Sequence, residues 1–212
     1  AENSYQSEQN RLAAGMSTQA KILSAKEAVS SAEAALLSAE SNLEKTKESL
    51  ILMVGWSYGS EVEIGDLPEL ELARIEGIDV EADIEKALAN NYNLKLTERR
   101  LKNARTEKVR STQEQKQKNQ REAIATNVKD SHTSLLLARA NYEQALQAFE
   151  LEKTSMDSAE RKLAAGTITR NDYQNQQSAY LTAEVDVRTR KLALLTAMVD
   201  YQWAVDGLAS AS

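Results

Sequence analysis

The stretch Glu160-Arg161-Lys162-Leu163-Ala164-Ala165-Gly166 closely resembles an earlier one, Gln9-Asn10-Arg11-Leu12-Ala13-Ala14-Gly15. In each, a run that suits a helix ends in glycine, the residue that most often terminates a helix. Aligning the two glycines also aligns Leu43 with Leu194, well beyond the turn. The sequence therefore predicts a duplicated helical hairpin, in which the chain reverses at each Leu-Ala-Ala-Gly sequence.

Composition predicts that most of the remaining chain is helical too. The 212 residues include seven glycines and a single proline, so helix breakers are rare. Four of the glycines lie between Gly55 and Gly77, together with Pro68, and this segment is expected to be an irregular connector. Only 5% of the residues are aromatic, which favours thin seams of Ala and Leu over a thick core.

Apolar and small residues recur at alternating steps of three and four, the spacing of a helix packed in coiled-coil fashion. Between the first turn and Gly55, this seam consists of Ile22, Ala25, Val29, Ala32, Leu36, Ala39, Leu43, Thr46, Leu50 and Met53. Before the second turn it consists of Ile124, Val128, Ser131, Leu135, Ala138, Tyr142, Ala145, Phe149, Glu152, Met156, Ala159 and Leu163. After that turn it consists of Tyr173, Gln176, Tyr180, Ala183, Val187, Arg190, Leu194, Ala197 and Tyr201. We therefore expect an all-α fold, an elongated antiparallel coiled-coil-like helical bundle.

The middle of the chain is expected to connect two hairpin units. Val80 to Asn90 and Leu94 to Val109 each have the pattern of a short amphipathic helix. The segment 110–120 has no apolar residue, so it is either a solvated helix or the loop where the chain turns round, and we favour a turn or frayed helix ends. The expected organisation is a first hairpin unit at 1–54, a connector at 55–110 and a second hairpin unit at 111–212.

Charge and residue types argue against several classes of function. The net charge is −6 and charges of both signs are mixed, which argues against nucleic acid or anionic membrane surfaces as main partners. No run of 18 apolar residues occurs, so no helix is expected to span a membrane. There is no cysteine and one histidine, His132, expected to be solvated or at the edge of a seam. We therefore expect no metal site, no cofactor and no enzymatic activity, since no phosphate loop or catalytic set is present either.

Two tryptophans lie near the ends of the predicted helices that follow each turn. Trp56 and Trp203 are expected to pack locally at the base of the bundle. The alternative is an aromatic belt, which would need a membrane nearby.

Three segments together resemble the TolC-like outer-membrane efflux protein family. They are Arg11-Leu12-Ala13-Ala14-Gly15-Met16-Ser17, Lys162-Leu163-Ala164-Ala165-Gly166-Thr167-Ile168-Thr169, and the connector helix sequence from Asp83 to Leu94. No single segment is specific, but their order and spacing are typical of the family. The resemblance implies a helical tunnel, with both turns at its far tip, where they meet a periplasmic adaptor protein.

The sequence also departs from that family. Each family repeat carries β-strands that build a barrel in the outer membrane, and the second repeat's strands would lie between about Val109 and Ala123. That segment is too short for a strand pair and its loop. The chain therefore more closely resembles barrel-less members from Gram-positive bacteria, or a barrel-deleted form. We also expect an N-terminal truncation, because only Ala1 to Leu12 precede the first turn.

The resemblance implies a partner-binding site at the two turns. Its expected residues are Arg11, Leu12, Gly15, Met16, Ser17, Lys162, Leu163, Gly166, Thr167, Ile168 and Asp172. Met16 and Ile168 would project an apolar contact from the end of the bundle. Asp172 matches a family position that is often acidic near the tunnel entrance, but its counterpart here is Lys21, so a ring of acidic gates is not expected. The alternative is that each glycine only ends a helix between two hairpin arms.

The expected function is a non-enzymatic subunit of a cell-envelope export system. It would form an α-helical conduit or spacer, dock tip to tip with a membrane-fusion adaptor, and couple through it to an inner-membrane transporter. The number of copies stays open, with a homotrimer as one alternative. The expected location is extracytoplasmic: the surface of a Gram-positive cell, or the periplasm and outer membrane for a fragment of a barrel-bearing protein. One alternative is an extracytoplasmic structural or interaction bundle with no conduit. A weaker one, the adaptor hairpin itself, lacks the strand segments that flank adaptor hairpins.

Overall fold

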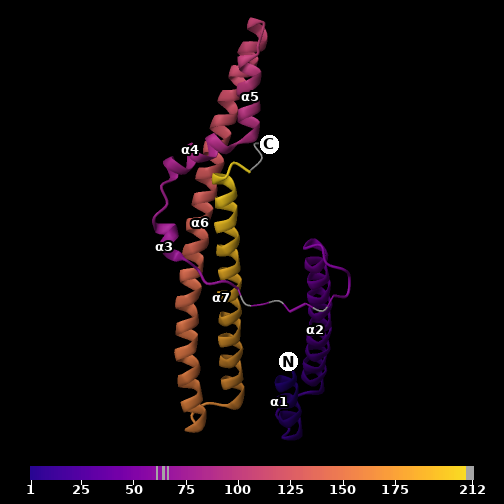
Figure 1. Cartoon of the computed structure of the whole chain (residues 1–212). Helices are drawn as coiled ribbons and strands as arrows, with labels where there is room; N and C mark the ends of the chain where they lie inside the picture. The colour runs from indigo at the N-terminus through magenta and orange to yellow at the C-terminus, as the bar shows by residue number, and fades with distance from the viewer. Residues whose placement is uncertain (61, 64, 66, 209–212) are drawn as a thin grey trace. The chain divides into compact units, whose positions relative to one another are not determined.

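The computed structural model describes residues 1–60, 62–63, 65 and 67–208, and these residues form seven α-helices and no strand. The helices are α1 (Glu2–Ala13), α2 (Gln19–Met53), α3 (Leu72–Glu76), α4 (Val80–Asn90), α5 (Tyr92–Lys102), α6 (Glu107–Ala164) and α7 (Arg170–Val205) (Figure 1). The all-α prediction is therefore confirmed.

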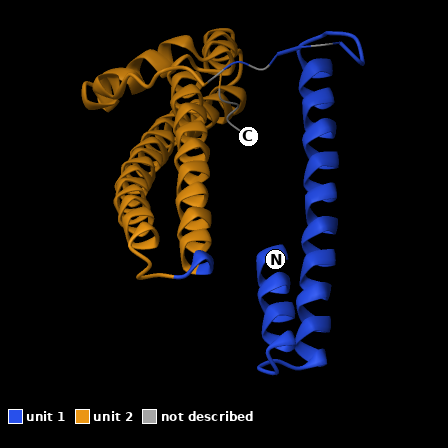
Figure 2. Ribbon diagram, turned by 90° about the horizontal axis from the view of Figure 1, so that it is seen from below, with its two compact units in different colours: residues 1–66, 169–171 blue, residues 67–168, 172–212 orange. Residues whose placement is uncertain are grey.

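The chain divides into two compact units, shown in different colours in Figure 2. Unit 1 contains residues 1–66 and 169–171, and unit 2 contains residues 67–168 and 172–212. The predicted boundary between residues 110 and 111 lies inside helix α6. Each unit contains a helical hairpin, α1–α2 in unit 1 and α6–α7 in unit 2, but their arms differ greatly in length. Their origin by duplication stays a prediction.

In unit 1, the 12-residue helix α1 packs antiparallel on the first part of the 35-residue helix α2 (Figure 2). It leaves Ile22, Ala25 and Val29 of the α2 seam half-buried. From Ala32 onward every predicted seam position up to Leu43 is exposed, and Met53 at the far end is 81% exposed. The coiled-coil spacing is therefore present along all of α2, but only its first part has a partner helix within the unit.

In unit 2, α6 and α7 form an antiparallel pair along the whole length of α7 (Figure 1). Every predicted α6 seam residue is buried or half-buried, and so is every α7 seam residue except Arg190, which turns outward to pair with Asp186 at 3.2 Å. The polar seam residues Glu152 and Gln176 meet each other, because Gln176 Nε2 donates to Glu152 Oε2 at 2.6 Å. At this position the two seams match a polar residue with a polar residue.

The connector helices α4 and α5 pack on α6. The bounds of α4 are those expected, and its first turn is capped by Asp79, whose side chain accepts a hydrogen bond from the Ala82 N–H at 3.1 Å. The second connector helix was expected to reach Val109, which is wrong: α5 ends at Lys102. A new helix begins at Glu107, with Thr106 as its N-cap, so Val109 belongs to α6.

The expectation of a turn at residues 110–120 is also wrong, because α6 runs through this segment without a break. Gln113, Gln117 and Gln120 lie on the stripe that continues to Ile124, and all three glutamines are half-buried. Gln117 Nε2 donates to Glu98 Oε1 of α5 at 3.2 Å. The helical stripe is therefore present here, but it is made of glutamine, so a search for apolar spacing does not find it.

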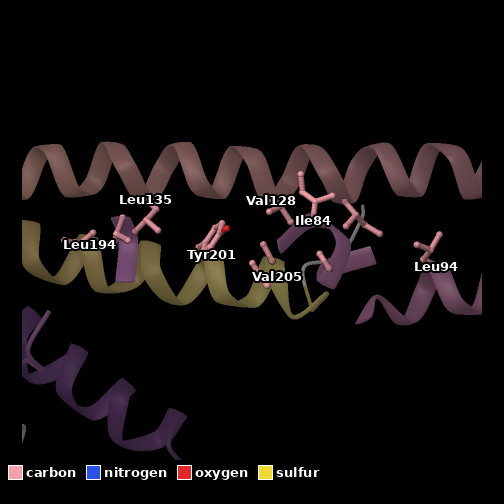
Figure 3. Packing of buried hydrophobic residues seen from close by; sticks show 11 residues of the cluster. Ile84, Leu94, Val128, Leu135, Leu194, Tyr201 and Val205 are labelled. Carbon is pink, nitrogen blue, oxygen red and sulfur yellow. The ribbon is translucent and has the colours of Figure 1, made fainter. Parts of the chain in front are cut away.

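The buried core lies in unit 2, where α3, α4, α5 and α7 meet α6. Figure 3 shows Val128 and Leu135 of α6 facing Leu194, Tyr201 and Val205 of α7. Leu135 and Leu194 are completely enclosed, at 1% and 0% exposure. This core fixes the connector against the helix pair.

Trp56 and Trp203 are 53% and 56% exposed, so the expectation that both pack in the base of the bundle is wrong. Within the described residues, no helix is long and apolar enough to cross a membrane.

Candidate functional site

The first predicted tip is a tight reversal between α1 and α2. Its C-cap is Ala14, the Gly15 N–H donates to Leu12 O at 2.9 Å, and the Met16 N–H donates to Arg11 O at 2.7 Å. Gly15 has a φ of 73°. This pair of hydrogen bonds with a left-handed glycine is a Schellman motif, which satisfies carbonyls at the helix end.

The second tip closes in the same way between α6 and α7. The Gly166 N–H donates to Leu163 O at 2.9 Å, the Thr167 N–H donates to Lys162 O at 2.9 Å, and Gly166 has a φ of 68°. The Thr167 hydroxyl adds a bond to Lys162 O at 3.0 Å. The two similar Leu-Ala-Ala-Gly sequences therefore adopt the same backbone geometry.

Nothing packs against either turn glycine. A Cβ added to Gly15 or to Gly166 would meet no atom within 4 Å. Glycine is needed at both positions for its positive φ alone, because an L-residue there is strained by about 1 kcal/mol or more. The backbone of each tip is therefore open to a partner on the side where a glycine Cβ would project.

The side chains of the two tips differ in exposure. Met16 is 67% exposed, as expected for a residue that projects from the first tip. Ile168 was expected to project likewise, but it is half-buried. Ile168, Lys162 and Asp172 together line a shallow groove of about 410 Å³ between the ends of α6 and α7. The second tip therefore offers a small mixed groove where the first offers a protruding apolar side chain.

Glu8 organises the polar side of the first tip. Its carboxylate accepts a hydrogen bond from the Ser17 hydroxyl and lies 3.3 Å from Nη1 of Arg11. Arg11 and Ser17, both predicted site residues, are thus joined through a residue that the sequence did not single out. In the second tip, Asp172 lies in the first turn of α7, where a negative charge is favoured by the helix dipole.

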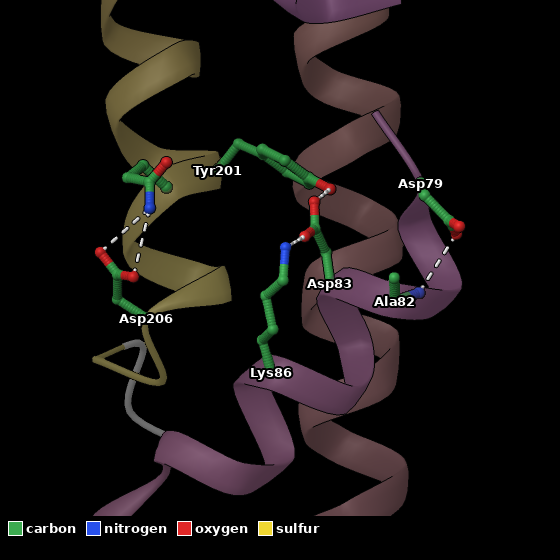
Figure 4. Close-up of polar contacts among 7 residues, drawn as sticks. Asp79, Ala82, Asp83, Lys86, Tyr201 and Asp206 are labelled. Atoms are coloured by element: carbon green, nitrogen blue, oxygen red, sulfur yellow. Dashed lines mark hydrogen bonds and ion pairs between the residues drawn. The ribbon is translucent and has the colours of Figure 1, made fainter. Parts of the chain in front are cut away.

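A separate polar cluster joins the connector to the helix pair, and we call Asp83, Lys86 and Tyr201 the latch (Figure 4). The Tyr201 hydroxyl donates to Asp83 Oδ2 at 2.8 Å, and Lys86 Nζ donates to Asp83 Oδ1 at 2.7 Å. The His132 ring lies 5.8 Å from that of Tyr201, so this half-buried histidine belongs to a seam edge. The latch ties α4 to α7.

The latch alters the acidity of its members. Burial raises the pKa of Asp83, but the hydrogen bonds from Lys86 and Tyr201 outweigh it, and the net pKa lies below the ordinary value. Burial and the hydrogen bond to Asp83 raise the pKa of Tyr201 well above its usual range. Asp83 is therefore ionised and Tyr201 protonated at neutral pH, as the hydrogen bond between them requires.

The end of α7 is fixed beside the latch. The buried Asn91 side chain accepts from the Leu94 N–H at 2.9 Å and donates to Gly207 O at 3.2 Å. Gly207 has a φ of 72°, and a Cβ there would lie 2.8 Å from the Asn91 nitrogen. This glycine is thus required by backbone contact as well as by conformation.

A groove of about 610 Å³ opens next to the latch. Its walls come from α3, α4, α6 and α7 and include Ile75, Ile78, Leu135, Met198, Tyr201 and Val205. Its rim carries charges of both signs, from Arg74 and Lys86 and from Asp79 and Asp206. Such mixed charge selects no ligand class.

The sequence did not predict the latch or the Asn91–Gly207 contact. Asp83 and Tyr201 were each placed in an element correctly, as a connector residue and a seam residue. The contacts were not predicted because these residues are far apart in sequence. A short apolar pattern does not indicate which elements pack together when they are more than a hundred residues apart. A tyrosine at a seam position, needing a buried partner for its hydroxyl, was the available signal.

The described residues contain no group of three or more His, Cys, Asp and Glu that could hold a metal ion. No protein-family model matches the chain, and no curated protein matches it either.

Proposed function

We propose that this chain is a non-enzymatic component of a cell-envelope export system, located outside the cytoplasmic membrane. It acts as an α-helical conduit or spacer, and its hairpin tips dock with the helical hairpin of a membrane-fusion adaptor that leads to an inner-membrane transporter. One observation carries the proposal: each hairpin reverses between its two arms through the same Leu-Ala-Ala-Gly Schellman turn, with nothing packed on its glycine. This supports the docking role that the family resemblance implies.

The chemistry of the tips suits end-on contact between hairpins. Met16 supplies a flexible apolar side chain, which adapts to an uneven partner surface and stabilises the contact by roughly 1.5–3 kcal/mol if fully buried. Around it, Arg11 and Ser17 are held in place by Glu8. At the second tip, the groove beside Ile168 accepts a small side chain between Lys162 and Asp172.

The test is retention of a purified adaptor hairpin, from the same genome, by the immobilised chain. In the test variant, Met16→Glu is combined with Thr167→Glu, which charges both tips without changing either glycine. We expect retention to be lost while the circular dichroism spectrum stays helical. The matched control combines Ser38→Glu and Ser134→Glu, two exposed positions in the helix arms, and should retain the adaptor. Undiminished retention by the tip variant would contradict the docking role.

A second candidate function is an extracytoplasmic structural or interaction bundle that conducts nothing. The exposed seam of α2 supports it, because a bare coiled-coil stripe calls for a partner helix but not for a lumen.

The two candidates differ in assembly. Small-angle scattering combined with light scattering should give a tubular trimer for a conduit. A species that stays non-tubular at all concentrations favours the interaction bundle.

A further inference from the structure

The hairpin formed by α5 and the start of α6 carries charge mostly of one sign. Residues 99–118, which we call the basic end, contain eight basic and two acidic side chains. Their formal charge is +6, in a chain whose net charge is −6. All eight basic side chains are exposed: Arg99, Arg100, Lys102, Arg105, Lys108, Arg110, Lys116 and Lys118. Charges of the two signs, which are mixed over the chain as a whole, are therefore segregated here.

Contacts within the protein leave most of these charges without a counterion. Among the described residues, Lys118 is the only one of the eight that has an ion-pair partner, Glu122, at 4.0 Å. The two carboxylates of the basic end, Glu107 and Glu114, are exposed and form no ion pair with a described residue. The basic end is therefore a concentration of positive charge that its own fold does not neutralise.

Helix stability explains only part of this charge. Arg99, Arg100 and Lys102 lie in the last turn of α5, where the helix dipole favours cations. Lys108 and Arg110 lie in the first turn of α6, where the same dipole disfavours them. The cations of α6 are thus unfavourable locally, and an anionic partner would offset that cost.

The basic end also projects from unit 2. Helix α5 and the first part of α6 extend beyond the end of α7 (Figure 1). Between them the chain reverses in a short turn, which the Asn103 N–H closes by donating to Arg99 O at 3.2 Å. The second tip lies at the opposite end of the same 58-residue helix. A partner bound to the basic end would therefore leave the second tip free.

The positions of the cations round α6 indicate the shape of the partner. At about 100° per residue, four cations project in directions roughly 80–120° apart: Lys108, Lys116, Arg110 and Lys118. A rod-shaped polyanion such as duplex nucleic acid would contact one side of the hairpin only. Residues 93–131 contain no aromatic side chain on which the bases of a single strand would stack. A flat anionic surface met end-on attracts cations on every side of the hairpin, so it is the better complement.

We propose that the basic end binds end-on to the surface of an anionic phospholipid membrane, without crossing it. Each cation near such a surface strengthens binding roughly fivefold. Val109, which is 47% exposed and lies between Lys108 and Arg110, adds an apolar side chain that enters the headgroup region.

The charge of the remaining chain favours the same orientation. Since the whole chain carries −6 and the basic end +6, the remainder carries −12 and is repelled by an anionic surface. Screening limits each interaction to about 8 Å at physiological ionic strength, so the cations nearest the surface dominate. The net charge argued against an anionic membrane as a main partner, and the inference revises that expectation for the basic end alone. It goes beyond the proposed function and is tested without an adaptor.

The first experiment measures sedimentation of the full chain with vesicles of equal parts phosphatidylglycerol and phosphatidylcholine. Combining Arg105→Gln with Lys108→Gln should weaken binding about 25-fold, since each cation contributes roughly a factor of five. The matched control combines Lys153→Gln with Arg161→Gln, which removes the same charge from exposed positions in the other half of α6. The control should bind like the wild type, and helical circular dichroism checks that both variants fold.

Several outcomes of this experiment would overturn the proposal. One is a wild-type chain that does not bind these vesicles, or that binds vesicles of phosphatidylcholine alone equally well. Another is an equal loss in both double variants, because net charge and not the basic end would then govern binding. A third is tighter binding to soluble duplex DNA or polyglutamate than to the vesicles, lost in the test variant, because the basic end then belongs to that partner.

The second experiment tests the end-on orientation with a fluorophore on a single cysteine, which is simple because the chain has none of its own. The positions are two exposed asparagines, Asn103→Cys at the turn and Asn127→Cys further along α6. Vesicles that carry a nitroxide-labelled lipid should quench the fluorophore at the turn and leave the other unchanged. Equal quenching at both positions would show that the hairpin lies along the membrane and would overturn the end-on geometry.

Discussion

The two hairpins of this protein have turns of the same type, but they differ in what covers their seams. In the hairpin of α1 and α2, the seam is packed only near the turn and has no partner helix from Ala32 to Met53. In the hairpin of α6 and α7, the seam is packed along all of α7, and α4 and α5 cover α6 further on. Leu43 and Leu194 occupy aligned positions, yet one is 65% exposed and the other 0%.

This difference teaches that heptad spacing reports a helix's capacity to pair and says nothing of whether its partner is present. The spacing in α2 is as regular as in α6. Full burial of one leucine stabilises a fold by roughly 1.5–3 kcal/mol, so the bare seam leaves a stabilisation of several kcal/mol unrealised in unit 1. Substitutions at aligned positions can measure that difference directly.

The largest expected effect is at the aligned leucines. Leu194→Ala should lower the free energy of unfolding of unit 2 by about 3 kcal/mol, because it removes a fully enclosed side chain and leaves a cavity. Leu43→Ala should change stability by less than about 0.5 kcal/mol in dilute solution, since the side chain is already in water. Urea unfolding of both variants at low concentration is the measurement. Equal losses would show that the hairpins are covered alike.

Next come the glycines that end α2 and α7. Gly55 and Gly207 both have a positive φ, but only Gly207 lies against backbone, that of Asn91. Gly55→Ala should cost about 1 kcal/mol from the strained φ, and Gly207→Ala about 2.5 kcal/mol, because the chain must also shift away from Asn91. Gly77→Ala, at a φ of −90°, is the control without strain. Thermal unfolding should show the greatest loss for Gly207→Ala, a smaller one for Gly55→Ala and the least for the control.

The latch exists only in unit 2, where Tyr201 aligns with Leu50 of the first hairpin. Tyr201→Phe should cost about 1.5 kcal/mol at pH 7, because it removes a hydrogen bond to an ionised carboxylate. The folded pKa of Asp83 lies below its unfolded value, near 4, so its contribution is complete above that pH and disappears as the pH falls through the folded pKa.

The cost of Tyr201→Phe should therefore shrink in acid, when unfolding is measured at pH 7 and again near pH 3. Tyr92→Phe, at a tyrosine that is 71% exposed, should cost nothing at either pH. An effect of Tyr201→Phe that is the same at both values would show that packing of the ring, not its hydroxyl, is what matters.

The smallest expected effect is a gain, where α5 covers the polar end of α6. The Oε1 atoms of Gln113 and Gln120 are buried without a hydrogen-bond partner among the described residues. Gln120→Leu should raise stability by about 1 kcal/mol, since it replaces an unsatisfied acceptor by apolar volume. Gln147→Leu, at an exposed position on the same helix, should give no gain. A loss at Gln120 would show that α5 does not enclose it.

The sequence predicted the hairpins well where spacing and turn chemistry agree. Both Leu-Ala-Ala-Gly turns, the α6 and α7 seams and the bounds of α4 follow from local rules, because a left-handed glycine and an apolar stripe are decided by residues a few positions apart. In the structure, the side chain of Asp79 caps the start of α4, which is also a local contact.

The parts of the structure that were not predicted depend on contacts between distant residues or on seams made of polar residues. Gln113, Gln117 and Gln120 carry the stripe of α6 without any apolar residue, so the helix there was mistaken for a turn. The break between α5 and α6 was missed because Val109 continued an apolar pattern across it. For the candidate site, the turns were predictable, but Glu8, which holds Arg11 and Ser17, and the half-burial of Ile168 were not.

Helix α6 has one more consequence, which follows from its length. Its 58 residues run without a break from the packing site of α5 to the second tip, a span of roughly 87 Å at about 1.5 Å per residue. Each residue added to it would lengthen that span and also rotate everything beyond by about 100°. Only an insertion of about seven residues, with an equal insertion in α7, would keep the seam aligned and keep α5 on the same side of α6. The length of α6 can therefore be increased or decreased only in steps of about seven residues if both packing contacts are to be kept.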